Sequence, residues 1–310
     1  MKPNAWRRLR RRTKDILYMS GAGALRWGVR RMSNEGVQRR ADQLGALAHR
    51  VFKREAEIAR RQLIDAFPTT TEEEARETAR RCFQKLAASA LELFKHRQLN
   101  SQTIGSVVEA GEAERIREAL SAGQGCVLVM AHFGNWELGG AAVALNGVPF
   151  WPLGRELRSP ALNRLAVEQR TRYGMRPISR ERGLRGVVEC LRSNGALGIL
   201  PDVDTSVEGV YVPFFGKLAY TPVGPYLLSR KYDAPALPVF IERTEPGRHR
   251  LRVGEPIQWK RTDAEKQSRI ANAAIYTNII ERQIRREPEQ WIWMHERWKR
   301  QPETEQGGAD

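Results

Sequence analysis

The feature that most constrains the fold is a change of pattern after residue 124. Four short apolar runs follow, "CVLVM", "PFWPL", "ALGILP" and "ALPVFIE", and each is rich in strand-forming residues. Helical stretches such as 160–173 and 181–193 separate these runs. Because strands that alternate with helices build parallel sheets, we expect an α/β fold with a single mixed, largely parallel sheet flanked by helices.

The chain before residue 124 is helical in pattern. Residues 36–66 place apolar side chains at helical spacing, with Arg and Lys on the other face: Leu44, Leu47, Val51 and Ile58. Pro68 ends this stretch, Thr71 and Glu74 fit a capping box for the next helix, and 111–121 is a short third helix. We therefore divide the chain into a basic helical arm (1–66), an α/β domain (67–300) and a disordered tail (301–310).

A closing helix follows the last predicted strand. Thr262 and Glu265 suggest its cap. Its expected buried stripe is Ile270, Ala274, Thr277 and Ile284.

Positive charge is concentrated at the beginning of the chain. The formal net charge is +16, and residues 1–61 hold 17 Lys or Arg against 5 Asp or Glu. Such an arm suits an anionic membrane surface, where each basic residue contributes roughly 1 kcal/mol, but also nucleic acid or plain solubility. The apolar run 16–25 fits either an interfacial amphipathic helix or an ordinary surface helix, and no run is long enough to span a bilayer.

Cysteine usage indicates a reduced, cytoplasmic compartment. Cys82, Cys126 and Cys190 are far apart and odd in number, so they suggest neither a disulfide framework nor a metal site. Asp202 and Asp204 lack a third ligand, and we expect no metal there.

A histidine follows the first apolar run. "AHFGNWELGG" (131–140) places His132 in the turn after a strand and Glu137 at the start of a helix. Open α/β sheets carry ligand sites at the carboxyl edge of their strands. If the loop at Gly134 and Asn135 folds back, Glu137 can fix the imidazole tautomer, and the other ring nitrogen can accept a proton from an alcohol.

Several blocks together resemble the bacterial lipid A biosynthesis (late) acyltransferases, a branch of the lysophospholipid and glycerolipid acyltransferase superfamily. The block "HFGNWE" resembles their H-x-x-x-x-[DE] motif. "PLGRELRSPALNRL" resembles their arginine block, "ILPDVDTSVEGVYVPFFGKLAYTP" their aspartate and V-x-V-P-F-F-G block, and "REPEQWIWMHERWK" their C-terminal segment. The blocks cover roughly residues 65–300 in the family's order.

The resemblance implies roles for the matching residues. His132 would be the base, and Glu137 would orient it. Arg155 would hold an acceptor phosphate or the oxyanion, and Asp202 and Asp204 would line the acceptor side. The donor would be a thioester on acyl carrier protein or coenzyme A, with no metal or redox cofactor. Partners would be an anionic glycolipid and the membrane surface, without specific nucleic acid.

Two departures from the family pattern affect this assignment. The aspartate block has Asp202, Val203 and Asp204 where members usually read Asp-Gln-Asp, which weakens the acceptor assignment. The hydrophobic anchor that many members carry is shortened and flanked by arginines, which favours peripheral attachment at the cytoplasmic face of the inner membrane.

Two blocks have alternative interpretations. Phe214, Phe215 and Lys217 of "VYVPFFGK" suit an acyl groove and a phosphate contact, but a buried strand and turn, with Gly216 at positive φ, is the favoured interpretation. The tryptophan-rich C-terminal block suits an interfacial surface or, as we favour, a structural clasp. Its His295 is not expected to be catalytic.

We expect the chain to transfer a fatty acyl group to a hydroxyl of a glycolipid, with a lipid A precursor as acceptor. The alternatives are the same chemistry on a phosphoinositol mannoside, lysophospholipid or aminolipid, an inactive acyltransferase-like scaffold, or a basic nucleic-acid-binding protein.

Overall fold

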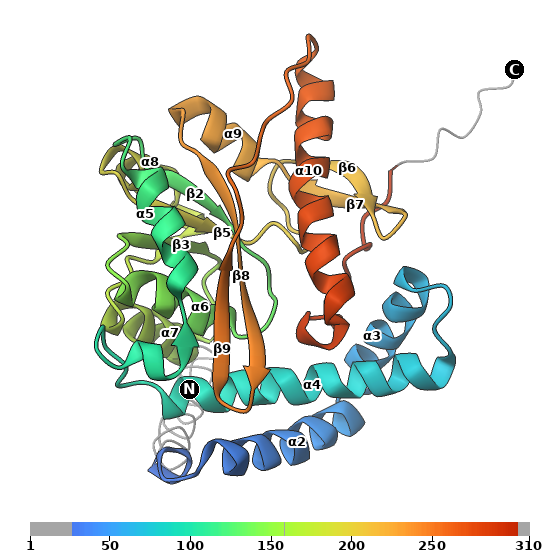
Figure 1. Cartoon of the computed structure of the whole chain (residues 1–310). Helices are drawn as coiled ribbons and strands as arrows, with labels where there is room; N and C mark the ends of the chain where they lie inside the picture. The colour runs from blue at the N-terminus through green and yellow to red at the C-terminus, as the bar shows by residue number, and fades with distance from the viewer. Residues whose placement is uncertain (1–26, 158, 303–310) are drawn as a thin grey trace, which may run out of the picture.

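The computed structural model describes residues 27–157 and 159–302 (Figure 1). The arginine run 7–12, the apolar run 16–25 and the tail from 303 lie outside the described residues, so these predictions stay untested. No helix within the described ranges has the length and apolar character needed to cross a membrane.

A seven-stranded sheet is the centre of the described chain. Its order is β1-β9-β8-β2-β5-β3-β4. Five neighbouring strands (β8, β2, β5, β3 and β4) are parallel, whereas β9 is antiparallel to β8 and parallel to β1. The strands are β1 (Val108–Glu109), β2 (Cys126–Val129), β3 (Phe150–Gly154), β4 (Ile178–Ser179), β5 (Ala196–Ile199), β8 (Ala236–Glu245) and β9 (Arg248–Val253). The predicted α/β class and the mixed, mostly parallel sheet are confirmed.

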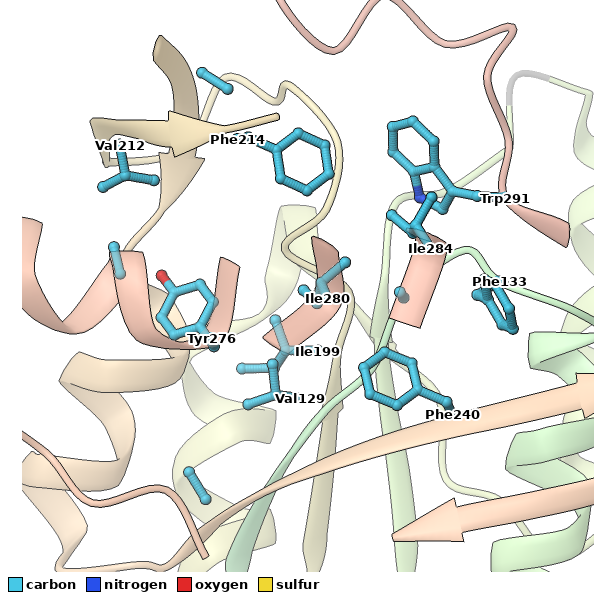
Figure 2. Close-up of a cluster of buried hydrophobic side chains, with 14 of the residues drawn as sticks. Val129, Phe133, Ile199, Val212, Phe214, Phe240, Tyr276, Ile280, Ile284 and Trp291 are labelled. Atoms are coloured by element: carbon cyan, nitrogen blue, oxygen red, sulfur yellow. The ribbon is translucent and has the colours of Figure 1, made fainter. Parts of the chain in front are cut away.

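Apolar side chains on both faces of the sheet are buried. In β2, Cys126 and Leu128 pack into one cluster, whereas Val127 and Val129 pack into the cluster on the opposite face. This arrangement explains why the central strands are continuous apolar runs, as in other sheets that are covered on both sides. Figure 2 shows part of the second cluster, in which Val129 and Ile199 lie near Ile280.

Helices cover the two faces. Helices α5 (Glu114–Leu120) and α6 (Trp136–Leu145) pack on one face, and α8 (Leu184–Arg192), α9 (Gly224–Tyr232) and α10 (Glu265–Arg286) pack on the other. Helix α7 (Pro160–Arg172) follows β3, and a hairpin of β6 (Gly209–Phe214) and β7 (Lys217–Pro222) contacts α10. Helices α2 (Asn34–Val51), α3 (Lys53–Ala66) and α4 (Glu72–Lys95) precede the sheet.

The predicted helix caps have different outcomes. The Thr71 hydroxyl accepts from the backbone N–H of Glu74, whose carboxylate accepts from the backbone N–H of Thr71, so the capping box of α4 is confirmed. The predicted cap of α10 is wrong. Ala264 is the N-cap without a side-chain bond, because the Thr262 hydroxyl donates to the carbonyl of Ala264.

Two predicted apolar stripes differ from the observed packing. In α10, Thr277 and Ile284 are buried as expected, but Ile270 is exposed. In α2, Leu44 and Leu47 are exposed, and the buried face beside them consists of Val37, Ala41 and Gly45.

Candidate functional site at the carboxyl edge of the sheet

The topology of the sheet brings His132 and Asp202 together. Strands β2 and β5 are parallel neighbours, and Val129 pairs with Ile199 at their ends. His132 and Asp202 each lie three residues beyond these paired positions. The imidazole Nδ1 of His132 lies 2.9 Å from Oδ1 of Asp202, and the backbone N–H of His132 donates to Oδ2 over 2.7 Å.

Asp202 is a buried carboxylate with several donors. The indole Nε1 of Trp291 donates to its Oδ2 over 2.8 Å, and the side chain has no exposed surface. Burial by itself raises the pKa of Asp202, but the His132 ring and the hydrogen bonds from His132 and Trp291 outweigh burial and lower the pKa below its usual 3.8. The carboxylate therefore stays ionised at neutral pH.

An ionised Asp202 fixes the tautomer of His132. A carboxylate only accepts, so Nδ1 carries the proton and donates it to Oδ1. This leaves the lone pair of Nε2 available as a proton acceptor. The side chain of His132 keeps 26% of its surface exposed, and its ring packs edge-on against Trp136 at 5.2 Å between centroids. The result is an oriented and accessible imidazole base.

The loop that carries His132 is built from close backbone approaches. Gly134 has φ of 59°, and a Cβ at this position would lie 2.0 Å from the carbonyl oxygen of Ile241. Its N–H donates to the carbonyl of Gln290, and Phe133 forms an isolated bridge with Trp291. Glycine is therefore required here because both the conformation and the space exclude a side chain.

The next residue, Asn135, is the N-cap of α6 and connects the loop to a buried charged network. Its amide oxygen accepts from the N–H of Leu138, and its amide nitrogen donates to Glu92 over 2.9 Å. Glu92 also binds the guanidinium of Arg243 and lies 3.1 Å from the ring of His249. Burial raises the pKa of Glu92, but Arg243 and His249 lower it well below its usual range.

The predicted contact between His132 and Glu137 is wrong. Arg170 of α7 holds Glu137 by two bonds, from Nε at 2.9 Å and from Nη2 at 2.5 Å. Among the described residues, the hydrogen bonds of the His132 ring go to Asp202 and not to Glu137. Asn135 starts α6 directly after the loop, and Glu137 on the first turn pairs with α7. Glu137 therefore does not orient the base.

Asp202 and Asp204, the two carboxylates expected on the acceptor side, both have partners within the protein. Asp202 is fully buried and accepts from Trp291 and from the ring of His132. The carboxylate of Asp204 accepts from the guanidinium Nε of Arg300 over 2.7 Å and from the backbone N–H of Arg300 over 3.0 Å. Asp204 thus fixes the C-terminal segment and does not present a free carboxylate to a ligand.

The other residues predicted for the site lie on different parts of the surface or in the core. Arg155 follows β3 and is 63% exposed, with a loose pair of 3.9 Å to Glu181. Lys217, at the start of β7, pairs with Asp65 of α3 over 2.8 Å. Lys217 is therefore engaged in an ion pair between two elements.

Phe214 and Phe215 are core residues, not the lining of an acyl groove. They contact each other and the rings of Trp291, Trp293 and Trp298. Figure 2 shows Phe214 opposite Trp291 in this cluster. Gly216 has φ of 77°, as the favoured interpretation of a buried strand and turn required. The C-terminal block is likewise the expected clasp, because Trp291 and Trp293 are buried.

Sequence reasoning missed two partners of the site. Trp291 was read as part of a clasp, although it also donates to Asp202. Arg170 carries no local signal beyond its place in a helix after β3. The one available signal was Glu137 itself, because a carboxylate at the start of a helix can pair with a cation on a neighbouring helix.

Within the described residues, no group of three His, Cys, Asp or Glu side chains is placed to hold a metal ion.

The fold and site define a class: an α/β protein in which a buried carboxylate holds a histidine ring at the carboxyl edge of a mostly parallel sheet. The family model described as bacterial lipid A biosynthesis acyltransferase matches residues 7–300. The chain belongs to this family, and it is an acyltransferase of the lipid A biosynthesis type.

Curated relatives agree with the family. The chain is 28% identical to the lipid A biosynthesis palmitoleoyltransferase of Escherichia coli K12 over 264 residues, 84% of each chain. It is 28% identical to the lipid A biosynthesis lauroyltransferase of the same organism over 288 residues, 91% of each chain. It is also 29% identical to the phosphatidylinositol mannoside acyltransferase of Mycolicibacterium smegmatis over 152 residues, 48% of this chain and 50% of the relative.

Proposed function

We propose that this acyltransferase moves a fatty acyl group from a thioester to a hydroxyl of a lipid A precursor, with His132 as the general base. The observation that carries the proposal is the contact of Nδ1 of His132 with the buried, ionised Asp202, which leaves Nε2 free to accept a proton. The donor is acyl carrier protein or coenzyme A carrying the acyl chain.

The proposed reaction has two proton transfers and one acyl transfer. Nε2 of His132 takes the proton of the acceptor hydroxyl while the oxygen attacks the thioester carbonyl carbon. The carbon–sulfur bond of the resulting tetrahedral intermediate breaks, and the thiolate takes the proton from the imidazolium. Asp202 stabilises the positive ring between these steps. No metal or redox cofactor is part of the proposal, because the thioester is already an activated acyl donor.

Arg155 is our candidate for binding the acceptor. It follows β3 and thus shares the carboxyl edge of the sheet with His132, and among the described residues its exposed guanidinium pairs loosely with Glu181. A guanidinium fork matches a phosphate group of an anionic glycolipid. Glu137 and Arg170 form a fixed ion pair at the start of α6, and we assign them to the wall of the site.

We place the protein at the cytoplasmic face of the inner membrane, attached peripherally. The excess of basic residues within 1–61 supports attraction to anionic lipid, and the acceptor itself is a lipid.

The experiment is an acyl-transfer assay with the full chain. Labelled acyl thioesters of acyl carrier protein and of coenzyme A are offered with a panel of lipid acceptors in detergent micelles. His132→Ala should stay folded but lose about 10²–10⁴-fold in kcat, because the hydroxyl loses its base. His49→Ala on α2 is the control, with parental activity expected. Parental activity in His132→Ala would refute the proposal.

A second acceptor class has an observation in its favour. The phosphatidylinositol mannoside acyltransferase relative matches 152 residues of the chain. Transfer to a phosphoinositol mannoside, with no transfer to lipid A precursors in the same panel, would assign the chain to this acceptor.

A further inference from the structure

Helix α2 exposes a stripe of large apolar side chains. Leu44, Leu47 and Val51 are 47%, 56% and 62% exposed, and the adjoining Phe52 is 54% exposed. Leu44, Leu47 and Val51 lie at spacings of three and four residues and thus share one face of the helix, and Phe52 is the C-cap that follows Val51. We call these four residues the outer stripe.

The packing of α2 on α4 explains why this stripe is left outside. The buried face of α2 consists of Val37, Ala41 and Gly45. At Gly45 the two helices approach so closely that a Cβ would lie 2.4 Å from the Cα of Gln84. Residues with short side chains therefore make the contact with α4, and the larger Leu44, Leu47 and Val51 border this buried face and stay about half exposed.

Cations surround the outer stripe. On the helix Arg40 lies among these residues and Arg50 beside them. Lys53, Arg54 and the acidic Glu55 begin α3, where Arg54 pairs with Glu296. The acidic residues of α2 lie elsewhere: Glu35 is in the first turn, and Asp42 accepts from Gln38 off this face. An apolar stripe flanked by cations matches the interface of a bilayer with anionic headgroups.

The stripe and the catalytic loop lie at the same end of the molecule. Strands β2 and β8 are parallel, and their carboxyl ends point toward α4, with α2 on the far side of α4 (Figure 1). Ser89 of α4 donates to the carbonyl of Gly134, and Glu92 of α4 accepts from Asn135. The end of the sheet that holds His132 and the helix that carries the stripe are therefore both packed on α4, which lies between them.

We propose that the outer stripe of α2 and its flanking arginines dock the protein on an anionic bilayer. This inference rests on the peripheral attachment proposed above and assigns it to a particular face. The apolar side chains enter the interface between headgroups and acyl chains, and the cations bind lipid phosphates.

The test measures co-sedimentation of the full chain with vesicles of phosphatidylcholine, with or without phosphatidylglycerol. A variant with Leu44→Ser, Leu47→Ser and Val51→Ser should lose at least about tenfold in affinity for the anionic vesicles, with an unchanged melting temperature, because the buried apolar area is lost. Arg40→Gln with Arg50→Gln should also weaken binding and reduce its salt dependence. The control is Val167→Ser, Leu184→Ser and Leu218→Ser, which changes exposed apolar residues on other elements and should bind like the parent.

Three outcomes separate the possibilities. Parental binding by the α2 serine variant would overturn the inference. So would a change in its oligomeric state by light scattering with vesicle binding retained, since the stripe would then be a contact between two copies. In detergent micelles the serine variant should keep acyl transfer, whereas His132→Ala should lose transfer but keep vesicle binding, so failure of the docking face and failure of the catalytic assignment are distinguishable.

Discussion

A single carboxylate, Asp202, decides how His132 is held. Asp202 is fully buried, accepts from both the ring and the backbone of His132, and receives a third bond from Trp291. Glu137 is nearer to His132 in sequence but is bound by Arg170. Proximity along the chain was therefore a poor guide to the partner of the base.

Asp202→Asn tests this assignment. An amide in place of the carboxylate can donate to Nδ1, which moves the ring proton to Nε2 and removes the base. We expect kcat to fall by about 10²–10⁴-fold while KM changes little, because binding groups are untouched. Steady-state kinetics and circular dichroism check the result, and a variant with parental kcat would contradict the role of Asp202.

The pH dependence of the parent follows from the lowered pKa of Asp202. The carboxylate contributes stability that is fully present above 3.8, its ordinary pKa, and is lost as the pH falls through the lower value of the folded state. Between neutral pH and about pH 3.8 Asp202 stays ionised in the folded protein, so a loss of activity in this range should not arise from its protonation. The pH profiles of kcat and of the free energy of unfolding check this.

At the scale of elements, the close contact of α2 and α4 depends on one glycine. A Cβ at Gly45 would meet the backbone of Gln84 at 2.4 Å, whereas one at Gly36 of the same helix would meet its nearest atoms at an ordinary 3.4 Å. The two glycines thus have the same helix propensity but different surroundings.

Gly45→Ala should lower the free energy of unfolding by about 1–3 kcal/mol, because α2 must move away from α4. Gly36→Ala is the matched control and should be neutral or stabilise by up to about 1 kcal/mol through helix propensity. Urea unfolding measures both. Equal stability of the two variants would show that the helices can separate without cost.

At the scale of the whole molecule, one buried ion pair connects the N-terminal helices to the sheet. Glu92 of α4 and Arg243 of β8 are each 2% exposed, and His249 of β9 joins them. The same carboxylate holds Asn135 beside the catalytic loop. Three separate parts of the chain thus meet at Glu92.

Glu92→Gln should destabilise the fold by about 3–5 kcal/mol at neutral pH, because Arg243 is left buried without its countercharge. The pKa of Glu92 is lowered in the fold, so its contribution is present above 4.5, its ordinary value, and is lost as the pH falls below it. The difference in free energy of unfolding between parent and variant should therefore shrink on acidification below pH 4.5.

Urea unfolding across this pH range checks the prediction. Glu57→Gln, which removes an exposed carboxylate paired with Arg60 and Arg61, should change stability little. If the difference in free energy of unfolding between the parent and Glu92→Gln stays constant as the pH falls, the stabilisation does not come from the charge of Glu92.

The sequence alone determined the α/β class, the capping box of α4 and the place of His132 after a strand, because each depends on local periodicity or spacing. Tertiary structure decided the rest. Asp202 reaches His132 because β2 and β5 are neighbours although β3 and β4 lie between them in the chain, and strand order is not encoded in local spacing. Likewise, the spacing of Leu44 fits a helix whichever face of α2 is buried. The close approach to α4, which Gly45 permits, determines which face is buried.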